Sequence, residues 1–292
     1  MDLRLSIAQT NPVLGDISKN LEEHLRLARA AAADGADLVL FPELSLTGYF
    51  LRDQVFDLAM YLDAPELEPL LELSKAVSIV FGMAERHRDG RCFNSMVFLE
   101  DGKVLGVHRK VHLVSYGMFD ESRDFAPGEE WNTIESRLGR FGLFLCEDLW
   151  HLDGQYVRIL DRVDALLVAS AGPGRGVGPQ EGAQGFESLG TWRTLLSAAA
   201  MHSLSYVAWA NRVGFEDGVA FSGGSALFGP DGRLRTTLDG LEEGELSVSL
   251  TSAELHRARQ RTPLLRDGRP ELVRRALGSA PPQATDGDSA AS

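Results

Sequence analysis

Short apolar runs alternate with amphipathic stretches along this chain, and most changes between them occur at glycine, proline or a polar turn. A strand is expected over residues 3–9, an amphipathic helix over 18–33 and a short buried strand over 36–41. Gly35 ends the helix. A strand–helix–strand order of this kind predicts parallel strand pairing and an α/β layer architecture.

The same alternation continues to about residue 250. Hairpins are expected where 91–100 meets 103–111 through Asp101-Gly102, and where 225–228 meets 233–237 through Pro230-Asp231-Gly232. Further helices are expected over 64–77, 156–162 and 189–203, and further strands over 78–83, 133–135, 140–145, 165–170, 206–210 and 245–250. The strands divide into two similar halves, which predicts two sheets packed face to face with helices outside.

Composition and charge narrow the class of protein. The 292 residues carry a formal net charge of −13, which argues against nucleic-acid or membrane-surface binding, because both reward an excess of Lys and Arg. No apolar run reaches the ~18 residues that a membrane helix needs, and the first residues have no signal-peptide pattern. The two cysteines, Cys92 and Cys146, lie far apart, so neither a disulfide framework nor a zinc site is expected. We therefore expect a cytoplasmic protein with reduced thiols.

The chain is expected to form one domain. No linker is apparent before about residue 250, and residues 1–278 are assigned to that domain. Residues 279–292 are small and polar with prolines, so a disordered tail is expected there. Basic residues gather over 257–275 among prolines and acids, which favours a solvated segment that packs on a partner subunit over a nucleic-acid patch.

The most informative stretch is 141–150, which reads Phe-Gly-Leu-Phe-Leu-Cys-Glu-Asp-Leu-Trp. An apolar run ends there in Cys146, and two carboxylates follow at once. Many α/β hydrolases expose a nucleophile in this way, on a tight turn at the end of a strand. A buried structural thiol is the alternative, because free cysteine is among the most buried residue types. Two observations favour the interpretation of Cys146 as a nucleophile. Polar residues follow it directly, and a base and a cation occur at the ends of earlier strands.

Glu43, Lys110 and Glu121 are the candidates for those supporting groups. Glu43 follows the predicted strand 36–41. A carboxylate held among apolar neighbours has a raised pKa and can act as a general base. The alternative is that Glu43 caps a helix or lies on the surface. Lys110 lies at a strand end. If it is buried it needs a carboxylate partner, and Glu43 or Glu121 is available. In that position it would stabilise the negative charge that develops on a tetrahedral oxygen. Otherwise it is an exposed edge lysine. Composition alone places Glu121 in a solvated loop.

The histidines raise two other hypotheses, a Cys–His pair and a metal site. His151 follows Cys146 by five residues, but its position favours a place at the entrance of the site or at a helix cap. His108 and His112 are four residues apart in a strand context without an HExxH pattern, so no metal is expected. The glycine-rich residues 172–178 spell neither a dinucleotide-binding nor a phosphate-binding motif, so they indicate no nucleotide cofactor.

Three motifs carry a family resemblance. Glu43 in FPELSLTGY, Lys110 in HRKVHL and Cys146 in FLCEDLW resemble, in the same order, the Glu–Lys–Cys triad of the nitrilase superfamily of carbon–nitrogen hydrolases. The likeness runs from about residue 3 to residue 250, with Glu121 at the place of the family's second acid and 211–214 and 221–225 at its last core motif. It implies an αββα four-layer sandwich of two mixed β-sheets flanked by helices. It also implies an amidase that works through a thioester, with no cofactor.

Within this superfamily the chain is most similar to the glutaminase domain of glutamine-dependent NAD synthetases. That likeness implies that Tyr49, Phe119 and Glu147 line the amide pocket. Gly172 lies in the loop 171–176, where that branch has an Asn- and Ser-containing segment that holds the amino-acid end of glutamine. The loop differs here, and no segment of the 292 residues resembles the synthetase domain. We therefore expect a different substrate pocket with the same chemistry.

The resemblance also implies partners. Members of the family pair through helices, so a homodimer or higher homo-oligomer is expected, with 189–203 and the C-terminal segment at the interface. The expected substrate is a small carboxamide that releases ammonia. Three alternatives stay open: a subunit that passes ammonia to a separate synthetase, a hydrolase of nitriles, and a binding protein that keeps the fold without turnover.

Overall fold

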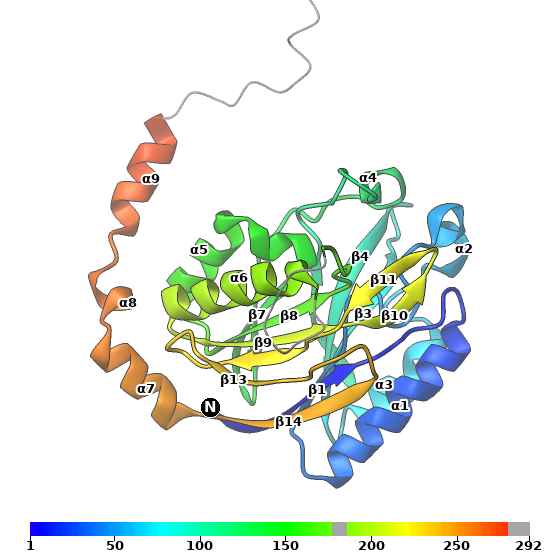
Figure 1. Ribbon diagram of the computed structural model, residues 1–292, viewed down its shortest axis with the longest axis horizontal. Helices are drawn as coiled ribbons and strands as arrows, with labels where there is room; N and C mark the ends of the chain where they lie inside the picture. Colours follow the sequence, from blue (N-terminus) through cyan, green and yellow to red (C-terminus); the bar gives the residue numbers. More distant parts are fainter. Residues whose placement is uncertain (177–185, 280–292) are drawn as a thin grey trace, which may run out of the picture.

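Four layers make up the chain, in the order helices, sheet, sheet, helices (Figure 1). The computed structural model describes residues 1–176 and 186–279. The predicted fold class is confirmed: the chain is an α/β protein with two mixed sheets flanked by helices. The predicted disordered tail, residues 279–292, lies outside the described residues except for Ser279, which ends the last helix. The domain boundary at 278 stays a prediction.

The first sheet has six strands in the order β14-β1-β2-β3-β4-β5. Their bounds are β1 Asp2–Gln9, β2 Leu38–Leu40, β3 Ser78–Arg86, β4 Cys92–Glu100, β5 Lys103–Arg109 and β14 Gly244–Thr251. β1, β2 and β3 pair in parallel, as the strand–helix–strand opening predicts, and the other neighbours pair antiparallel. The carboxyl ends of β2 and β5 therefore lie at the same edge of the sheet, and Glu43 and Lys110 follow those two ends.

The second sheet also has six strands, in the order β13-β12-β9-β8-β7-β6. Their bounds are β6 Thr133–Ser136, β7 Gly139–Leu145, β8 Ala165–Ser170, β9 Tyr206–Asn211, β12 Ala226–Phe228 and β13 Leu234–Thr237. The central strands β7, β8 and β9 are parallel, and antiparallel strands complete both edges. Cys146 follows directly after β7.

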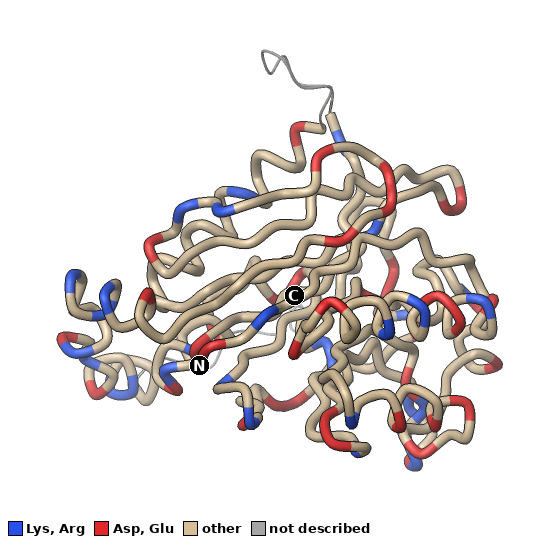
Figure 2. Tube along the Cα trace, turned by 90° about the horizontal axis from the view of Figure 1, so that it is seen from below, with Lys and Arg blue, Asp and Glu red and all other residues tan. Residues whose placement is uncertain are grey.

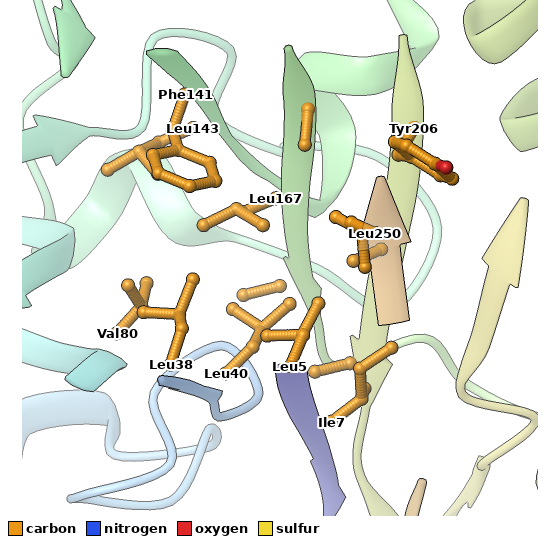
Figure 3. Close-up of a cluster of buried hydrophobic side chains, with 14 of the residues drawn as sticks. Leu5, Ile7, Leu38, Leu40, Val80, Phe141, Leu143, Leu167, Tyr206 and Leu250 are labelled. Carbon is orange, nitrogen blue, oxygen red and sulfur yellow. The ribbon is translucent and has the colours of Figure 1, made fainter. Parts of the chain in front are cut away.

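The two sheets bury their facing sides against each other. Leu5 and Leu40 from the first sheet and Leu143 and Leu167 from the second all have no exposed surface. Figure 3 shows these side chains filling the space between the two sheets. Each strand of a sheet sends alternate side chains to this layer and to the outer helices, so the central strands are apolar along their whole length.

Helices cover both outer faces (Figure 1). α1 (Ile17–Ala33) and α3 (Glu68–Leu73) pack on the first sheet, while α5 (Leu152–Asp161) and α6 (Glu187–Ser203) pack on the second. The shorter elements are the 3₁₀ turns η1 Arg52–Gln54, η2 Pro65–Leu67 and η3 Cys146–Trp150 and the helices α2 Val55–Leu58 and α4 Glu121–Asp124.

The helix predicted over 64–77 is shorter than expected. It is divided between η2 and α3, and α3 ends at Leu73. The Ser74 hydroxyl donates to the carbonyl oxygen of Leu71 and accepts the Gly102 N–H, at 2.7 and 3.0 Å. A serine that bonds nearby backbone groups competes with helix continuation, and the hydrophobic pattern alone does not show this.

A short hairpin was not predicted. β10 (Val213–Glu216) and β11 (Val219–Ser222) pair as a separate two-stranded sheet. Asp217 and Gly218 have φ values of 50° and 80°, as the two central residues of a type I′ turn require. The Asp-Gly dipeptide was therefore a usable signal, but the flanking runs are only four residues long.

The C-terminal segment is helical. α7 (Ser252–Arg261), α8 (Leu264–Asp267) and α9 (Pro270–Ser279) follow β14, and α8 and α9 run away from the four layers (Figure 1). Figure 2 shows acidic and basic residues mixed over the periphery of the chain. The expected packing of this basic segment on a partner subunit stays a prediction. None of the helices in residues 1–176 and 186–279 combines the length and apolar character that crossing a bilayer requires.

Candidate active site

Glu43 lies three residues beyond β2 and is fully buried. Its Oε1 accepts hydrogen bonds from Asn94 Nδ2 at 2.8 Å and from Lys110 Nζ at 2.7 Å, and its Oε2 accepts the Ala171 N–H at 2.8 Å. Burial raises the pKa of Glu43, and the charge of Glu121 adds to the effect, while Lys110 opposes it. The helix-cap and surface-acid alternatives do not apply, because the carboxylate is enclosed and fully hydrogen-bonded.

A glycine on the neighbouring strand allows this placement. A Cβ at Gly82 of β3 would lie 2.3 Å from Leu44 N and 2.7 Å from Pro42 O, closer than atoms can pack. The segment that carries Glu43 therefore lies directly on the backbone of β3. Only a residue without a side chain fits at this position.

Lys110 lies one residue beyond β5 and is also buried. Its Nζ donates to Glu43 Oε1 and to Glu121 Oε1, both at 2.7 Å. Burial alone would lower the pKa of Lys110, but the carboxylates of Glu121 and Glu43 outweigh it and hold that pKa well above the ordinary value. Lys110 is therefore charged at neutral pH, and the edge-lysine alternative is wrong.

Glu121 begins α4 and is buried, so the solvated loop that composition indicated is wrong. Besides Lys110, its Oε1 accepts the Tyr49 hydroxyl at 2.5 Å, and its Oε2 accepts the Val114 N–H at 2.9 Å. Burial and the neighbouring charges of Glu121 and Glu43 raise the pKa of Tyr49 well above the ordinary value. Tyr49 therefore stays a neutral hydrogen-bond donor to this acid.

Cys146 is the first residue of η3, at the point where β7 stops. Its φ of 44° lies in the left-handed region, which residues with a side chain rarely adopt, so the thiol is held on a strained turn. Burial raises the pKa of the Cys146 thiol well above the ordinary value, and the charge of Glu43 raises it further, while Lys110 lowers it. The raised pKa keeps the thiol protonated at neutral pH.

Asp148 ties the turn of Cys146 to the segment of Lys110. Its Oδ1 accepts the N–H groups of Val111 and His112 at 3.0 and 2.9 Å, and its Oδ2 lies 2.8 Å from His108 Nε2. The carboxylate has no exposed surface. Sequence reasoning did not identify Asp148 or Asn94; the polar pair Asn94-Ser95 inside an otherwise apolar stretch was the available signal for Asn94.

The predicted substrate-binding residues occupy different places. Tyr49 and Phe119 line a cavity of about 420 Å³ together with Glu121. Glu147 lies beside the thiol, where its charge acts on the pKa of Cys146, and it accepts the Tyr116 hydroxyl at 3.1 Å. Gly172 does not line this cavity: its N–H donates to Asn211 Oδ1 at 2.8 Å, and its carbonyl oxygen accepts from Ser222.

The histidines form neither of the alternative sites. His151 stacks on His112 with ring centroids 3.7 Å apart, and its Nε2 lies 3.6 Å from Glu147 Oε1. In the part of the chain that the structure describes, no histidine is hydrogen-bonded to Cys146, and no group of three potential metal ligands occurs.

A buried carboxylate and ammonium and a half-buried thiol, where two facing sheets end, together with the four-layer fold, are typical of a hydrolase. The chain belongs to the carbon–nitrogen hydrolase family, whose sequence pattern matches residues 4–260.

The relatives include two kinds of enzyme. The chain is 29% identical over 231 residues to the glutamine-dependent NAD(+) synthetase of Acinetobacter baylyi, covering 79% of this chain and 41% of that protein. It therefore spans less than half the length of that relative. It is 30% identical over 271 residues to an (R)-stereoselective amidase of a Pseudomonas species, covering 91% and 92% of the two chains.

A solved structure is also similar. The amidase of Nesterenkonia sp. AN1 superposes with a TM-score of 0.75 at 26% identity, covering 94% of this chain and 96% of that one. That structure is of a glutamate-to-glutamine variant with the acetamide moiety of fluoroacetamide added covalently at the active-site cysteine.

Proposed function

We propose that the chain is a cysteine-dependent amidohydrolase that cleaves the C–N bond of a small carboxamide through a thioester and releases ammonia. The observation that carries this proposal is the buried network in which Lys110 bridges Glu43 and Glu121 beside the strained turn of Cys146. A protonated thiol next to a carboxylate of raised pKa is a nucleophile paired with its general base.

In the first half of the reaction the Cys146 sulfur attacks the amide carbon and its proton passes to Glu43. The C=O bond becomes a C–O⁻ single bond, and Lys110 together with the backbone N–H of Glu147 stabilises that oxygen. Glu43 returns the proton to the departing nitrogen. Ammonia leaves, and an acyl thioester remains on Cys146.

In the second half a water molecule attacks the thioester carbon and gives its proton to Glu43. The C–S bond breaks, Cys146 regains the proton and a carboxylic acid leaves. Glu121 does not take up protons in this scheme. It keeps Lys110 charged and in place, and Tyr49 fixes Glu121 in turn.

The relatives support an amide substrate. The Pseudomonas relative is an amidase, and the Nesterenkonia amidase has a covalent acetamide adduct at its active-site cysteine. By similarity we assign the attacking role here to Cys146. The three groups Glu43, Lys110 and Cys146 are all present, which favours turnover over a binding protein that has lost activity.

The test is a screen of small primary amides with ammonia detection and mass spectrometry of Cys146. We expect the wild-type chain to release ammonia and to accumulate a thioester. Cys146→Ala should be folded and inactive. Lys110→Gln should lose about 10²–10³-fold in kcat/KM, the cost of losing one stabiliser of the oxyanion, and Glu43→Gln about 10²–10⁴-fold, the cost of losing the general base. Undiminished amidase activity in Cys146→Ala would contradict the mechanism.

A second candidate is a glutaminase subunit that donates ammonia to a separate synthetase. The similarity to glutamine-dependent NAD(+) synthetases over less than half their length favours it. Glutamine hydrolysis that is slow alone and rises strongly when a synthetase is added would support this function. Equal turnover with and without the synthetase would support the autonomous amidase.

A further inference from the structure

The hairpin of β10 and β11 contains a buried ion pair that the proposed reaction does not use. Glu216 ends β10, and its Oε2 accepts a hydrogen bond from Arg212 Nη1 at 2.5 Å. Glu216 is 6% exposed, and Arg212 has no exposed surface. The hairpin lies beside α2 (Figure 1), and its Phe221 shares a buried cluster with Tyr49. Desolvation of two buried charges offsets much of their attraction, so stability alone does not account for this pair.

The other oxygen of Glu216 binds the backbone that carries Tyr49. Its Oε1 accepts the N–H groups of Tyr49 and Phe50, at 2.8 and 2.5 Å. Both of these residues lie outside helices and strands. The carboxylate therefore supplies two buried backbone donors with an acceptor that regular secondary structure does not provide.

The ion pair is itself held on several sides. The guanidinium carbon of Arg212 lies 4.1 Å from the centroid of the Phe221 ring, on the neighbouring strand β11. Gly48 has a φ of 81°, and a Cβ there would lie 3.1 Å from Glu216 Oε2 and 2.8 Å from Leu14 Cα. The carboxylate is thus packed against the backbone that leads to Tyr49, and it has little freedom to move away.

The Tyr49 side chain connects this backbone to the candidate site. Its hydroxyl donates to Glu121 Oε1 at 2.5 Å, and the same oxygen accepts from Lys110 Nζ at 2.7 Å. The Tyr49 ring packs edge-on against Phe119 and Phe221, with ring centroids 5.8 and 6.2 Å apart. A tyrosine side chain has only two χ angles, so the place of its backbone and the packing of its ring fix the place of its hydroxyl.

We propose that Glu216 is a positioning residue of the reaction. It fixes the backbone of Tyr49, and the Tyr49 hydroxyl in turn holds Glu121. Glu121 then keeps the Lys110 ammonium where the oxyanion forms, and Arg212 orients the Glu216 carboxylate. This inference rests on the proposed amidohydrolase function. A displacement of about 1 Å at a catalytic group can cost 10²-fold in rate, so a contact outside the reacting groups can control turnover.

The test is a double-mutant cycle between Glu216 and the Tyr49 hydroxyl. Ammonia release from acetamide, propionamide and butyramide is measured for wild type, Glu216→Gln, Tyr49→Phe and the double variant. An amide has one acceptor oxygen, so Glu216→Gln leaves either Arg212 or the two N–H groups without an acceptor. We expect each single variant to lose about 10- to 100-fold in kcat, with KM changed by less than about threefold. The double variant should match the kcat of Tyr49→Phe within about twofold.

The cycle distinguishes positioning from a role in stability alone. The hydroxyl lies at the opposite end of the Tyr49 side chain from the N–H that Glu216 binds, so coupling between them passes through the position of the ring. Independent effects on stability would instead multiply in the double variant. Multiplied losses, or an unchanged kcat in Glu216→Gln, would overturn the proposal.

Arg212→Lys is a milder second variant, for use where Glu216→Gln does not fold. It keeps the positive charge and loses the planar fork that the carboxylate binds. We expect a smaller loss of kcat, and this loss should again disappear in the Tyr49→Phe background. A loss of the same size in both backgrounds would contradict the proposal.

Glu100→Gln is the matched control for a buried glutamate. Glu100 is 3% exposed and accepts the Arg137 N–H at 3.2 Å. It ends β4, roughly 20 Å along the strand from Asn94, which binds Glu43. A lower Tm with the kcat of wild type is expected. A loss of kcat equal to that of Glu216→Gln would show that any destabilisation slows turnover, and would overturn the assignment.

Alkylation of Cys146 by iodoacetamide reads the same coupling without an amide substrate. Lys110 lowers the pKa of the thiol, so a displaced ammonium should slow alkylation at a fixed pH. Mass spectrometry measures this rate in the same four proteins. If no amide is turned over and the coupling appears in alkylation, the proposed function fails and the positioning role stands. If an amide is turned over and the losses in kcat multiply, the function stands and the positioning role fails.

Discussion

At the scale of single residues, one buried ammonium organises the site. Lys110 Nζ lies 2.7 Å from both Glu43 and Glu121, so two carboxylates share one positive charge. An excess negative charge beside a thiol disfavours the thiolate. The same burial that raises the pKa of Glu43 raises the pKa of Cys146. The thiol therefore depends on proton transfer at the moment of attack, because it is not ionised beforehand.

This arrangement predicts how Cys146 reacts with iodoacetamide as pH changes. The folded thiol has a raised pKa, so its ionised fraction is small at neutral pH and grows as pH rises. We expect the alkylation rate to climb steadily to pH 9 and beyond. Mass spectrometry of the Cys146 peptide measures that rate, and the buried Cys92 serves as the slow internal reference. A plateau that begins below about pH 7, as for activated thiolates, would contradict the prediction.

At the scale of elements, strand ends and close backbone contacts place the reacting groups. β2 and β5 end at the same edge of the first sheet, and β7 ends in the turn of Cys146. Asp148 joins that turn to the segment after β5 through the N–H groups of Val111 and His112. Gly82 of β3 lets the Glu43 segment lie directly on the strand.

Gly82→Ala tests the importance of that close contact. The new Cβ would meet Leu44 N at 2.3 Å, so the backbone around Glu43 must move away. A displacement of about 1 Å at a catalytic group can cost 10²-fold in rate, and we expect a loss of that size in kcat. Activity assays on folded protein, checked by thermal melting, measure it.

Gly244→Ala is the matched control for this substitution. A Cβ there would lie 3.3 Å from a Leu238 side-chain atom, which can give way, and Gly244 is in β14, away from the site. Wild-type kcat in the control with a large loss in Gly82→Ala is the expected result. Wild-type kcat in both variants would show that Glu43 tolerates displacement.

At the scale of the whole molecule, the two sheets share a single core. Leu5 and Leu40 of one sheet and Leu143 and Leu167 of the other belong to one continuous cluster of buried side chains. Neither sheet can lose its partner without exposing this apolar layer to water. The described layers should therefore unfold as one unit.

Leu167→Ala tests this coupling. Removing a fully buried leucine side chain costs about 2–5 kcal/mol, and Leu167 has no exposed surface. We expect a lower urea midpoint of unfolding, with far-UV circular dichroism and tryptophan fluorescence changing together. Leu152→Ala, at a residue that is 73% exposed, should change stability by less than about 0.5 kcal/mol. Two separate transitions would show that the sheets unfold independently.

The sequence predicted most of this architecture because strand signals are local. The alternation around residues 3–9 and the apolar run before Cys146 correspond to β1 and β7. The β10–β11 hairpin was missed because its strands are short and because Glu216 joins it to a distant segment by accepting the N–H of Tyr49. Such contacts join residues far apart in the chain, and no local pattern records them.

The site was predicted only in part for the same reason. Glu43, Lys110 and Cys146 each lie at or just after the end of a predicted strand, so position along the chain marks them. Glu121 reads as a solvated acid from its neighbours, and its burial depends on Tyr49 and Lys110 closing over it.

The proposed base and cation come from one sheet and the proposed nucleophile from the other. The distance that the proton crosses from the Cys146 thiol to the Glu43 carboxylate is therefore set by the packing of the two sheets against each other, including side chains far from the reacting groups. Turnover would then respond to compression or loosening of the apolar interior well before the protein denatures. Hydrostatic pressure, which acts on packing and leaves every side chain unaltered, becomes a way to tune this reaction.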